Sequence, residues 1–412
     1  MLQPEIEMMP RPQLEALQLE RLQATVRRMR QSVPPMAQRL EGLPDPATLA
    51  DLADYPFMRK SDLRENYPFG LFAEPRENIR RIHASSGTTG KPTVVGYTES
   101  DLAVWADCMA RGLIAAGCRP GWILHNAYGY GLFTGGLGLH QGAERAGISV
   151  VPVSGGNTER QLMLIEDFAP EIVCCTPSFA LTLAERLGPA ARDTSLRVGI
   201  LGAEPWTDAM RDEIEERLNI SAVNLYGLSE VLGPGVSCET EARAGLVIAE
   251  DHFLAEVVDP DSGEVLPDGE VGVLVLTSLT KEAFPVLRYW TGDLCSMSRE
   301  PMEDGRTHAR MSAIVGRADD MLVIRGVNVY PSQVEYALLD VPAVSPHFQL
   351  IVEREQTLDT LEVLVEGREV DPEAVKTKLK SALGLSVSVT LAPDGSVPRS
   401  EGGKLNRVLD RR

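Results

Sequence analysis

The chain has 412 residues, and its 40 Lys and Arg against 59 Asp and Glu give a formal net charge of −19. This length excludes a small scaffold held together by disulfides, and the acidic balance argues against nucleic acid as the main partner, because phosphate backbones are bound by basic surfaces. No apolar run reaches the roughly 18 residues of a spanning helix, and the first residues have neither a basic nor an apolar segment of a signal peptide, so we expect neither feature. Six cysteines without a Cys-x-x-Cys pair predict reduced thiols in a cytoplasmic protein.

The first predicted element is an amphipathic helix over residues 13–30, where apolar residues recur at spacings of three and four. After residue 80, short apolar runs predict buried strands at 148–153, 172–175 and 198–201. Stretches of helical period alternate with them, at 99–116, 158–167 and 205–218. Strands and helices that alternate in this way predict a layered α/β fold with mostly parallel strands.

From about residue 250 the hydrophobic period becomes two, and the runs at 253–257 and 271–275 flank a turn at 259–263. This pattern predicts an antiparallel hairpin. Beyond residue 316 the chain has its own set of signals, with strand-like runs and a helix at 348–352, 361–365, 372–383 and 387–391. That set is sufficient for a small α+β domain. We therefore expect a large domain over residues 1–316 and a small domain over residues 317–412.

A stretch rich in Ser, Thr and Gly at residues 84–93 is the most informative part of the sequence. Its glycines can bring backbone N–H groups close to a ligand, its hydroxyls add donors, and Lys91 adds a positive charge, so it predicts a phosphate cradle. It is not a Walker A loop, because Pro92 stands where that motif needs Ser or Thr. The residues expected to contact phosphate are Ser85, Ser86, Gly87, Thr88, Thr89, Gly90, Lys91 and Thr93.

This loop resembles the phosphate loop of the adenylate-forming superfamily of acyl-CoA ligases, adenylation domains and luciferases. Residues 81–97 are most similar to the phenylacetate–CoA ligase family, and further motifs follow in order down almost the whole chain. The resemblance implies a large N-terminal domain of layered sheets and helices that binds ATP and the acyl substrate. It also implies a small, mobile C-terminal α+β domain that carries the adenylation lysine.

Residues 126–136 interleave three aromatic residues with glycines, a composition suited to an apolar slot for a planar ligand. In the resembled family this segment lies beside the acyl substrate. The residues expected in the acyl-substrate pocket are Tyr128, Tyr130, Phe133 and Gly135.

Two further motifs, at residues 202–205 and 224–230, follow or end strand-like runs. This is the position at which open α/β sheets place their ligands. By resemblance, Tyr226 stacks on adenine and Glu230 holds Mg²⁺, a task that suits a carboxylate placed beside ATP oxygens. By the same resemblance Asp293 and Arg317 bind the ribose, and Asp319 is the hinge between the domains. The expected adenine- and ribose-binding set is Gly202, Ala203, Glu204, Pro205, Asn224, Tyr226, Gly227, Asp293 and Arg317.

Lys404 matches the superfamily's adenylation lysine, which bridges the substrate carboxylate and the α-phosphate. A long cation suits that role, because negative charge builds on those oxygens in the transition state. With Glu230 and Lys91 it completes the expected catalytic set.

Some relatives of this family also carry a structural zinc site made of Cys and His. Candidate zinc ligands in this chain are Cys238, His252, Cys295 and His308. The Cys-x-Cys-Gly segment of those relatives is replaced here by residues 302–305. Buried structural cysteines are therefore the alternative interpretation.

The implied reaction is ATP-dependent, AMP-forming activation of an aryl or arylacetic acid, followed by transfer of the acyl group to CoA. Transfer to an amine or to a carrier protein is an alternative that the residues do not separate. A non-catalytic relative that binds aryl acids is a second alternative, against which Lys404, Glu230 and the phosphate loop argue. The expected small molecules are the acid, ATP, CoA and Mg²⁺. The resembled family suggests a homodimer, and no membrane partner is expected.

Overall fold

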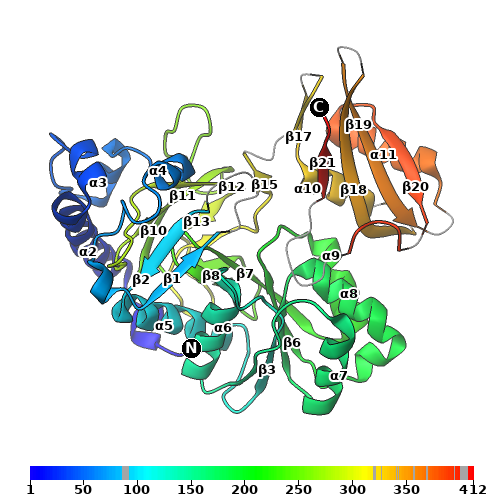
Figure 1. Ribbon diagram of the computed structural model, residues 1–412, viewed down its shortest axis with the longest axis horizontal. Coiled ribbons are helices and arrows are strands. Elements are labelled where there is room, and N and C mark those ends of the chain that lie inside the picture. The colour runs from blue at the N-terminus through cyan, green and yellow to red at the C-terminus, as the bar shows by residue number, and fades with distance from the viewer. Residues whose placement is uncertain are drawn as a thin grey trace.

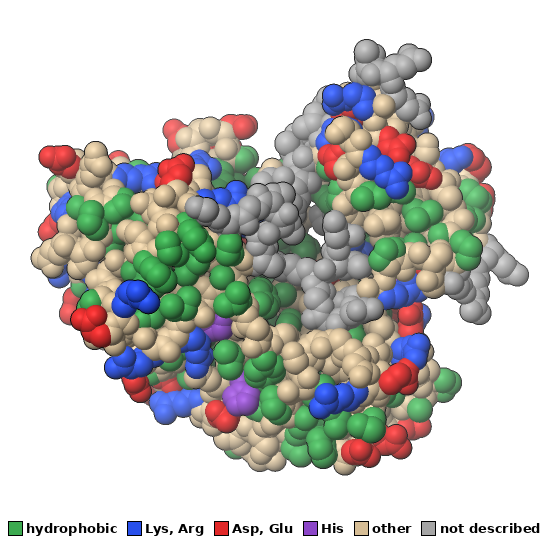
Figure 2. Space-filling model, in the orientation of Figure 1, with side chains coloured by type: hydrophobic (Ala, Val, Ile, Leu, Met, Phe, Trp, Pro, Cys, Tyr) green, Lys and Arg blue, Asp and Glu red, His purple; other side chains and the backbone are tan. Residues whose placement is uncertain are grey.

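The computed structural model describes residues 1–85, 92–318, 322–325, 327–339, 341, 343–355, 358–367, 370–393, 395–399 and 407–412. Figure 1 shows a large N-terminal region (residues 1–318) and a smaller C-terminal lobe (residues 322–412), here called the C-terminal region, which lies beside α8 and α9. Figure 2 shows acidic and basic side chains interspersed over one face of the molecule. None of the helices in the described part of the chain combines the length and the apolar character needed to cross a bilayer.

The chain begins with helices that pack against the core of the N-terminal region. The predicted helix at 13–30 is confirmed as α2, and its buried face carries Leu22, Val26 and Met29. The helices and short 3₁₀ turns of this part are α1 (Pro4–Glu7), α2 (Arg11–Ser32), α3 (Pro34–Arg39), η1 (Leu49–Asp54), α4 (Lys60–Glu65) and η2 (Arg76–Asn78).

A nine-stranded sheet forms the centre of the N-terminal region, and half of it is parallel as predicted. The parallel strands, in spatial order, are β7 (Ser221–Leu228), β6 (Val198–Gly202), β5 (Ile172–Cys175), β3 (Ile123–Asn126) and β4 (Ser149–Val151). On the other side of β7 the pairing is antiparallel, through β8 (Gly233–Glu239), β9 (Leu246–Ile248), β14 (Arg310–Met311) and β13 (Met297–Ser298). The expectation of mostly parallel strands therefore fits only one half of this sheet.

Helices connect and cover these strands, and each predicted one is found within a few residues of its expected ends. The helix expected at 205–218 begins three residues later, because Thr207 is its N-cap and accepts a hydrogen bond from the Met210 N–H. The helices are α5 (Glu99–Ala115), α6 (Gly135–Arg145), α7 (Thr158–Phe168), α8 (Pro177–Leu187), η3 (Gly188–Asp193) and α9 (Asp208–Leu218).

Two smaller sheets complete the N-terminal region. A hairpin of β1 (Arg81–Ala84) and β2 (Val94–Tyr97) flanks the predicted phosphate loop. The predicted antiparallel hairpin is confirmed and belongs to a four-stranded sheet of β10 (Phe253–Val258), β11 (Gly272–Ser278), β12 (Tyr289–Cys295) and β15 (Gly316–Arg317).

The C-terminal region is α+β and has a hydrophobic cluster of its own, which runs from Leu322 to Leu385. Its α11 begins at the N-cap Asp371 with Pro372 in the first position and ends at Gly384, whose φ of +66° suits glycine. The elements are β16 (Leu322–Ile324), β17 (Val327–Val329), α10 (Pro331–Leu339), β18 (Val344–Glu355), β19 (Leu358–Gly367), α11 (Pro372–Leu383), β20 (Ser388–Ala392) and β21 (Val408–Asp410). The strands of the larger sheet lie in the order β20-β19-β18-β21.

Candidate active site

The candidate site lies at the carboxyl ends of the parallel strands. Four of these strands, β3, β5, β6 and β7, end at residues 126, 175, 202 and 228. The aromatic segment follows β3, residues 202–205 end and follow β6, and Glu230 lies in the turn after β7. Parallel strands place their carboxyl ends at one edge, so motifs from distant parts of the sequence meet there.

The base of the phosphate loop is closed by Ser85 and Thr93. The Ser85 backbone N–H donates to the Thr93 carbonyl oxygen at 3.0 Å, and the two hydroxyls are also hydrogen-bonded to each other. The six residues between them that the sequence assigned to phosphate, 86–91 with Lys91, lie outside the described residues. The described ends therefore fix where this loop leaves and rejoins the hairpin.

Glu230 contacts Thr93, just before β2 of that hairpin, although 137 residues separate the two in the sequence. The Thr93 hydroxyl donates to its carboxylate at 3.3 Å, and the carboxylate is 7% exposed. No ion pair joins Glu230 to an Arg, Lys or His among the described residues. A buried carboxylate next to hydroxyl oxygens is a donor set that Mg²⁺ accepts, so the side chains present fit the expected ion.

A second cluster joins the nine-stranded and the four-stranded sheets around Asp293. The Tyr226 hydroxyl donates to Asp293 Oδ2 at 2.6 Å, and Arg317 Nη1 donates to Asp293 Oδ1 at 2.5 Å. Asp293 and Arg317 are direct cross-strand partners of β12 and β15, which explains why a pair 24 residues apart meets. Burial, and then the nearby Asp293 carboxylate, raise the pKa of Tyr226 well above its usual range, so its hydroxyl keeps its proton.

Residues 202–205 lie between β6 and β7 in a backbone that demands small residues. A Cβ on Gly202 would come within 2.1 Å of the Leu225 carbonyl oxygen, and Ala203 has a φ of +71°. Glu204 accepts a hydrogen bond of 2.6 Å from the Ser178 N–H, at the start of α8. Gly227 on β7 is equally constrained, because a Cβ there would lie 1.9 Å from the Gly233 carbonyl oxygen.

Asn224 precedes Tyr226 on β7 and is 8% exposed. Its backbone N–H donates to Glu239 at 2.7 Å, and both oxygens of that carboxylate also accept hydrogen bonds from Arg211. Pro205 follows Glu204 directly and leads into the cap of α9. These contacts hold the expected adenine-binding residues on two adjacent strands.

The aromatic segment is held close to the other motifs. The Thr134 hydroxyl lies 2.9 Å from the Ser229 hydroxyl, and the Ala84 N–H donates to the Leu132 carbonyl oxygen at 2.9 Å. Phe133 is partly exposed, and a Cβ on Gly135 would lie 2.9 Å from its ring. The aromatic segment therefore lies between the β1–β2 hairpin and the turn that carries Glu230.

The two tyrosines of this segment differ in their surroundings. The Tyr128 hydroxyl donates to the carbonyl oxygens of Cys175 and Gly202, at 2.6 and 3.2 Å, so it is used to join the ends of β5 and β6. Tyr130 is less buried, and its hydroxyl meets the amide of Asn126 and a ring nitrogen of His140. Burial raises the pKa of Tyr130 to about 12. Of the two tyrosines, Tyr130 is the more exposed.

A buried lysine near this site was missed by the sequence analysis. Lys281 is 5% exposed, and its Nζ lies 4.4 Å from the centre of the Tyr97 ring with no hydrogen-bond partner among the described residues. Burial lowers its pKa to about 8, against the pull of Asp101 and Glu230. A lone lysine between polar residues looks like a solvated charge in sequence, so no local signal could have found it.

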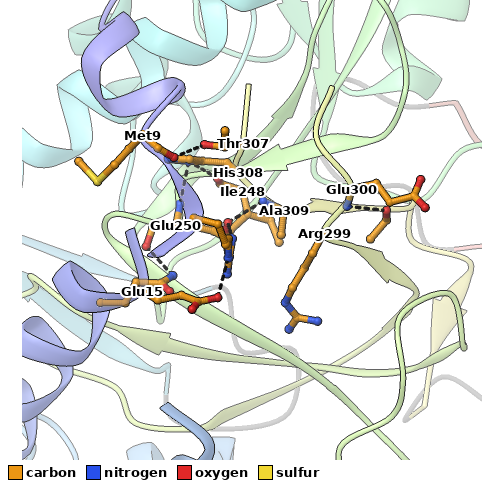
Figure 3. Close-up of polar contacts among 12 residues, drawn as sticks. Met9, Glu15, Ile248, Glu250, Arg299, Glu300, Thr307, His308 and Ala309 are labelled. Atoms are coloured by element: carbon orange, nitrogen blue, oxygen red, sulfur yellow. Dashed lines mark hydrogen bonds and ion pairs between the residues drawn. The ribbon is translucent and has the colours of Figure 1, made fainter. Parts of the chain in front are cut away.

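The expected zinc ligands do not come together. No group of three or more His, Cys, Asp or Glu in the described part of the chain could hold a metal ion. His308 has both ring nitrogens within 3.1 Å of backbone carbonyl oxygens, those of Ile248 and Ile6, beside the contacts of Thr307 and Ala309 drawn in Figure 3.

The other three candidates have separate surroundings. The ring nitrogens of His252 meet Thr280 and Asp251, at 2.8 and 3.0 Å. Cys238 donates to the Gly112 carbonyl oxygen, and Cys295 is buried in β12. The zinc prediction is therefore corrected to buried structural thiols and hydrogen-bonded histidines.

The remaining two expected residues, Asp319 and Lys404, lie outside the described residues. The described chain ends at Ala318 directly before Asp319, and at Arg399 five residues before Lys404. Their roles stay predictions.

Comparison with known proteins places both regions. Residues 73–280 match the model of the AMP-binding enzyme family, and residues 326–412 match that of the AMP-binding enzyme C-terminal domain. The chain is 56% identical to a phenylacetate–coenzyme A ligase of Thermus thermophilus, over all of both chains.

Two crystal structures of one relative, a 2-hydroxyisobutyryl-CoA ligase, bear on the arrangement of the regions. The postadenylation state with an acyl-AMP matches with a TM-score of 0.92, at 28% identity, over 99% of this chain and 92% of that one. The thioesterification state with CoA matches with a TM-score of 0.74, at 28% identity, over 99% and 91%. Both matches cover 99% of this chain. The lower TM-score of the thioesterification state therefore reflects a different placement of the two regions in that structure.

Proposed function

The chain belongs to the phenylacetate–coenzyme A ligase family, and on that premise we propose that its substrate is phenylacetic acid or a closely similar arylacetic acid. It is an AMP-forming ligase that activates an aromatic acid with ATP and passes the acyl group to CoA. The observation that carries this conclusion is 56% identity over the full length of both chains. A relative this similar over its full length supports the same fold for this chain.

In the first half-reaction a carboxylate oxygen of the acid forms a bond to the α-phosphorus of ATP, and the bond to pyrophosphate breaks. The protein contributes position and charge rather than covalent chemistry. We assign the ribose to Asp293, held from both sides by Tyr226 and Arg317. Glu230 would hold Mg²⁺, which neutralises phosphate charge when bound. We assign Lys404 to the developing charge on the reacting oxygens.

In the second half-reaction the thiol of CoA forms a bond to the acyl carbonyl carbon, its proton is lost, and AMP leaves. We propose that residues 1–316 and 317–412 are the two domains, and that the small one rotates at Asp319 between the steps. The higher TM-score with the postadenylation state supports the view that this structure has the adenylating placement. For the acyl pocket we propose Tyr130, Phe133 and Gly135. Tyr128 would support this segment through its hydrogen bonds to the ends of β5 and β6.

The test is acid-dependent exchange of pyrophosphate into ATP, over a panel of arylacetates, benzoates and short fatty acids. Each acid that supports exchange is then incubated with CoA, and the products are identified by mass spectrometry. Phenylacetate is expected to give both exchange and a CoA thioester. Exchange without a thioester would move the acceptor to an amine or a carrier protein. No exchange with any aryl acid would overturn the proposal.

A further inference from the structure

One carboxylate of the N-terminal region, that of Glu185 on α8, contacts two residues of the C-terminal region. His347 of β18 donates from Nε2 to Glu185 Oε1 at 2.7 Å, and Arg399 lies with its Nε 3.4 Å from Glu185 Oε2. Each carboxylate oxygen therefore has a different partner, and both partners come from the C-terminal region. His347 is 3% exposed, so its contact is shielded from water.

Arg399 is fixed from its own side of the junction as well. Its two Nη atoms donate to both oxygens of Glu366, at 3.1 and 2.8 Å, and that carboxylate is 1% exposed. Glu366 also accepts a hydrogen bond of 2.6 Å from the Val397 N–H. The planar guanidinium can serve both carboxylates at once, because its donors point in fixed directions.

The charges at this junction are complementary. Burial acts to raise the pKa of Glu185, but the hydrogen bond from His347 and the charge of Arg399 outweigh it and hold that pKa below its usual value. Glu213 of α9 also faces His347, and burial raises its pKa. An ionised Glu185 is therefore bound by two donors that belong to the other region.

We propose that Glu185, His347 and Arg399 form a latch that positions the C-terminal region for adenylation, so that breaking it is a condition for the second half-reaction. Arg399 is five residues before Lys404 in the sequence, so the latch fixes the start of the segment that carries the adenylation lysine. Rotation of the C-terminal region separates the two halves of the latch, because they lie on different regions. These are positioning residues, and the inference rests on the proposed ligase function.

Apolar contact accompanies the latch but cannot replace it. Leu339 at the end of α10 packs against the hydrophobic cluster of α8 and α9. Such contact is not directional, so it favours association without fixing the orientation. Hydrogen bonds between charged groups set the orientation, since they are lost within a small displacement.

The test compares the two half-reactions in single-turnover experiments with Glu185→Ala and the isosteric Glu185→Gln. Formation of acyl-adenylate is expected to fall about five- to twentyfold in Glu185→Ala and by a smaller factor in Glu185→Gln. Thioester formation from supplied acyl-adenylate and CoA is expected to stay the same or to become faster. The matched control is Glu159→Gln on α7. It removes an exposed ion pair with Arg186, the neighbour of Glu185 on α8, and is expected to change neither rate.

A second measurement does not depend on activity. Because the six native thiols are buried, spin labels can be attached to introduced cysteines at the exposed positions Glu166→Cys and Ala374→Cys, and the distance between them measured. Glu185→Ala is expected to broaden a single distance into a distribution, with an unchanged melting temperature. Equal losses in both half-reactions, or a wild-type distance distribution in the variant, would overturn the latch. Absence of adenylation in the wild-type chain would instead refute the proposed function.

Discussion

Around the candidate site, the N-terminal region ties buried polar side chains together across strands, whereas Glu185, which binds His347 and Arg399 of the C-terminal region among the described residues, is partly exposed. Asp293 is bound from two sides by Tyr226 and Arg317, and its side chain is 12% exposed. Glu185 at the junction is 32% exposed. Buried, mutually oriented groups keep one geometry through both half-reactions, while a small polar junction can form and break. We therefore expect the first to be a fixed site and the second to be a movable one.

The largest effect is expected from Lys404→Ala. Adenylate formation should fall by about a thousandfold or more, because the cation that meets the developing charge is removed. Thioester formation from supplied acyl-adenylate should be retained, since the C-terminal region has moved by then. Rapid-quench measurement of each half-reaction decides the matter, with the exposed Lys380→Ala of α11 as control. Equal losses in both steps would contradict a role confined to adenylation.

Asp293→Ala tests the fixed side of the comparison. Its loss should lower kcat/KM for ATP by about a hundredfold, because hydrogen bonds to a charged group are worth roughly 1.5–3 kcal/mol. Both half-reactions should suffer, since the ribose is present in ATP and in the acyl-adenylate. The control is Asp268→Ala, which removes an exposed ion pair with Arg299. If only one half-reaction were affected, the assignment of Asp293 to the ribose would be wrong.

Asp319→Pro tests the movable side. Proline fixes φ, so a hinge at this residue should lose freedom, and thioester formation should fall about tenfold more than adenylation. Single-turnover rates for each step, measured on the same preparation, provide the comparison. A larger loss in adenylation would count against the hinge.

Lys281→Met tests how the buried lysine near the candidate site affects the pH dependence of the free energy of unfolding. The pKa of Lys281 is about 8 in the folded chain and 10.5 in the reference state, so between these values the unfolded chain binds the extra proton. Stability of the wild type should therefore rise with pH from about 8 to about 10, by about 1–3 kcal/mol. The Met variant should lack this rise in urea unfolding. A rise of the same size in the variant would show that another group causes it.

The smallest effect is expected from Tyr128→Phe. The variant loses the hydrogen bonds to Cys175 and Gly202, which should cost about 1 kcal/mol of stability. The rate with the best aryl acid should change by less than about twofold, since removal of a neutral supporting group leaves the transition state intact. Thermal melting and steady-state kinetics together check this. Strongly reduced turnover with unchanged melting would instead place this hydroxyl against the substrate.

Much of the local structure could be predicted because its signals are local. The spacing of apolar residues gave α2, β5 and α11 close to their observed ends, and the alternation at 253–275 gave the hairpin of β10 and β11. The motifs likewise named Tyr226, Asp293 and Arg317, which the structure brings into contact. The antiparallel half of the nine-stranded sheet was missed, because β13 and β14 are two residues long, β9 is three, and β8 begins with Gly233, Pro234 and Gly235, which disfavour a strand.

The sequence by itself determined the family, the two-region organisation that was expected and the residue types of the site. Tertiary structure alone decided which side chains contact each other. Thr93 reaches Glu230, and Glu185 reaches His347, across 137 and 162 residues. It also separated the four expected zinc ligands and buried Lys281. The physical reason is that periodicity and motifs record local preference, whereas contacts between distant residues depend on strand order and on how the regions pack.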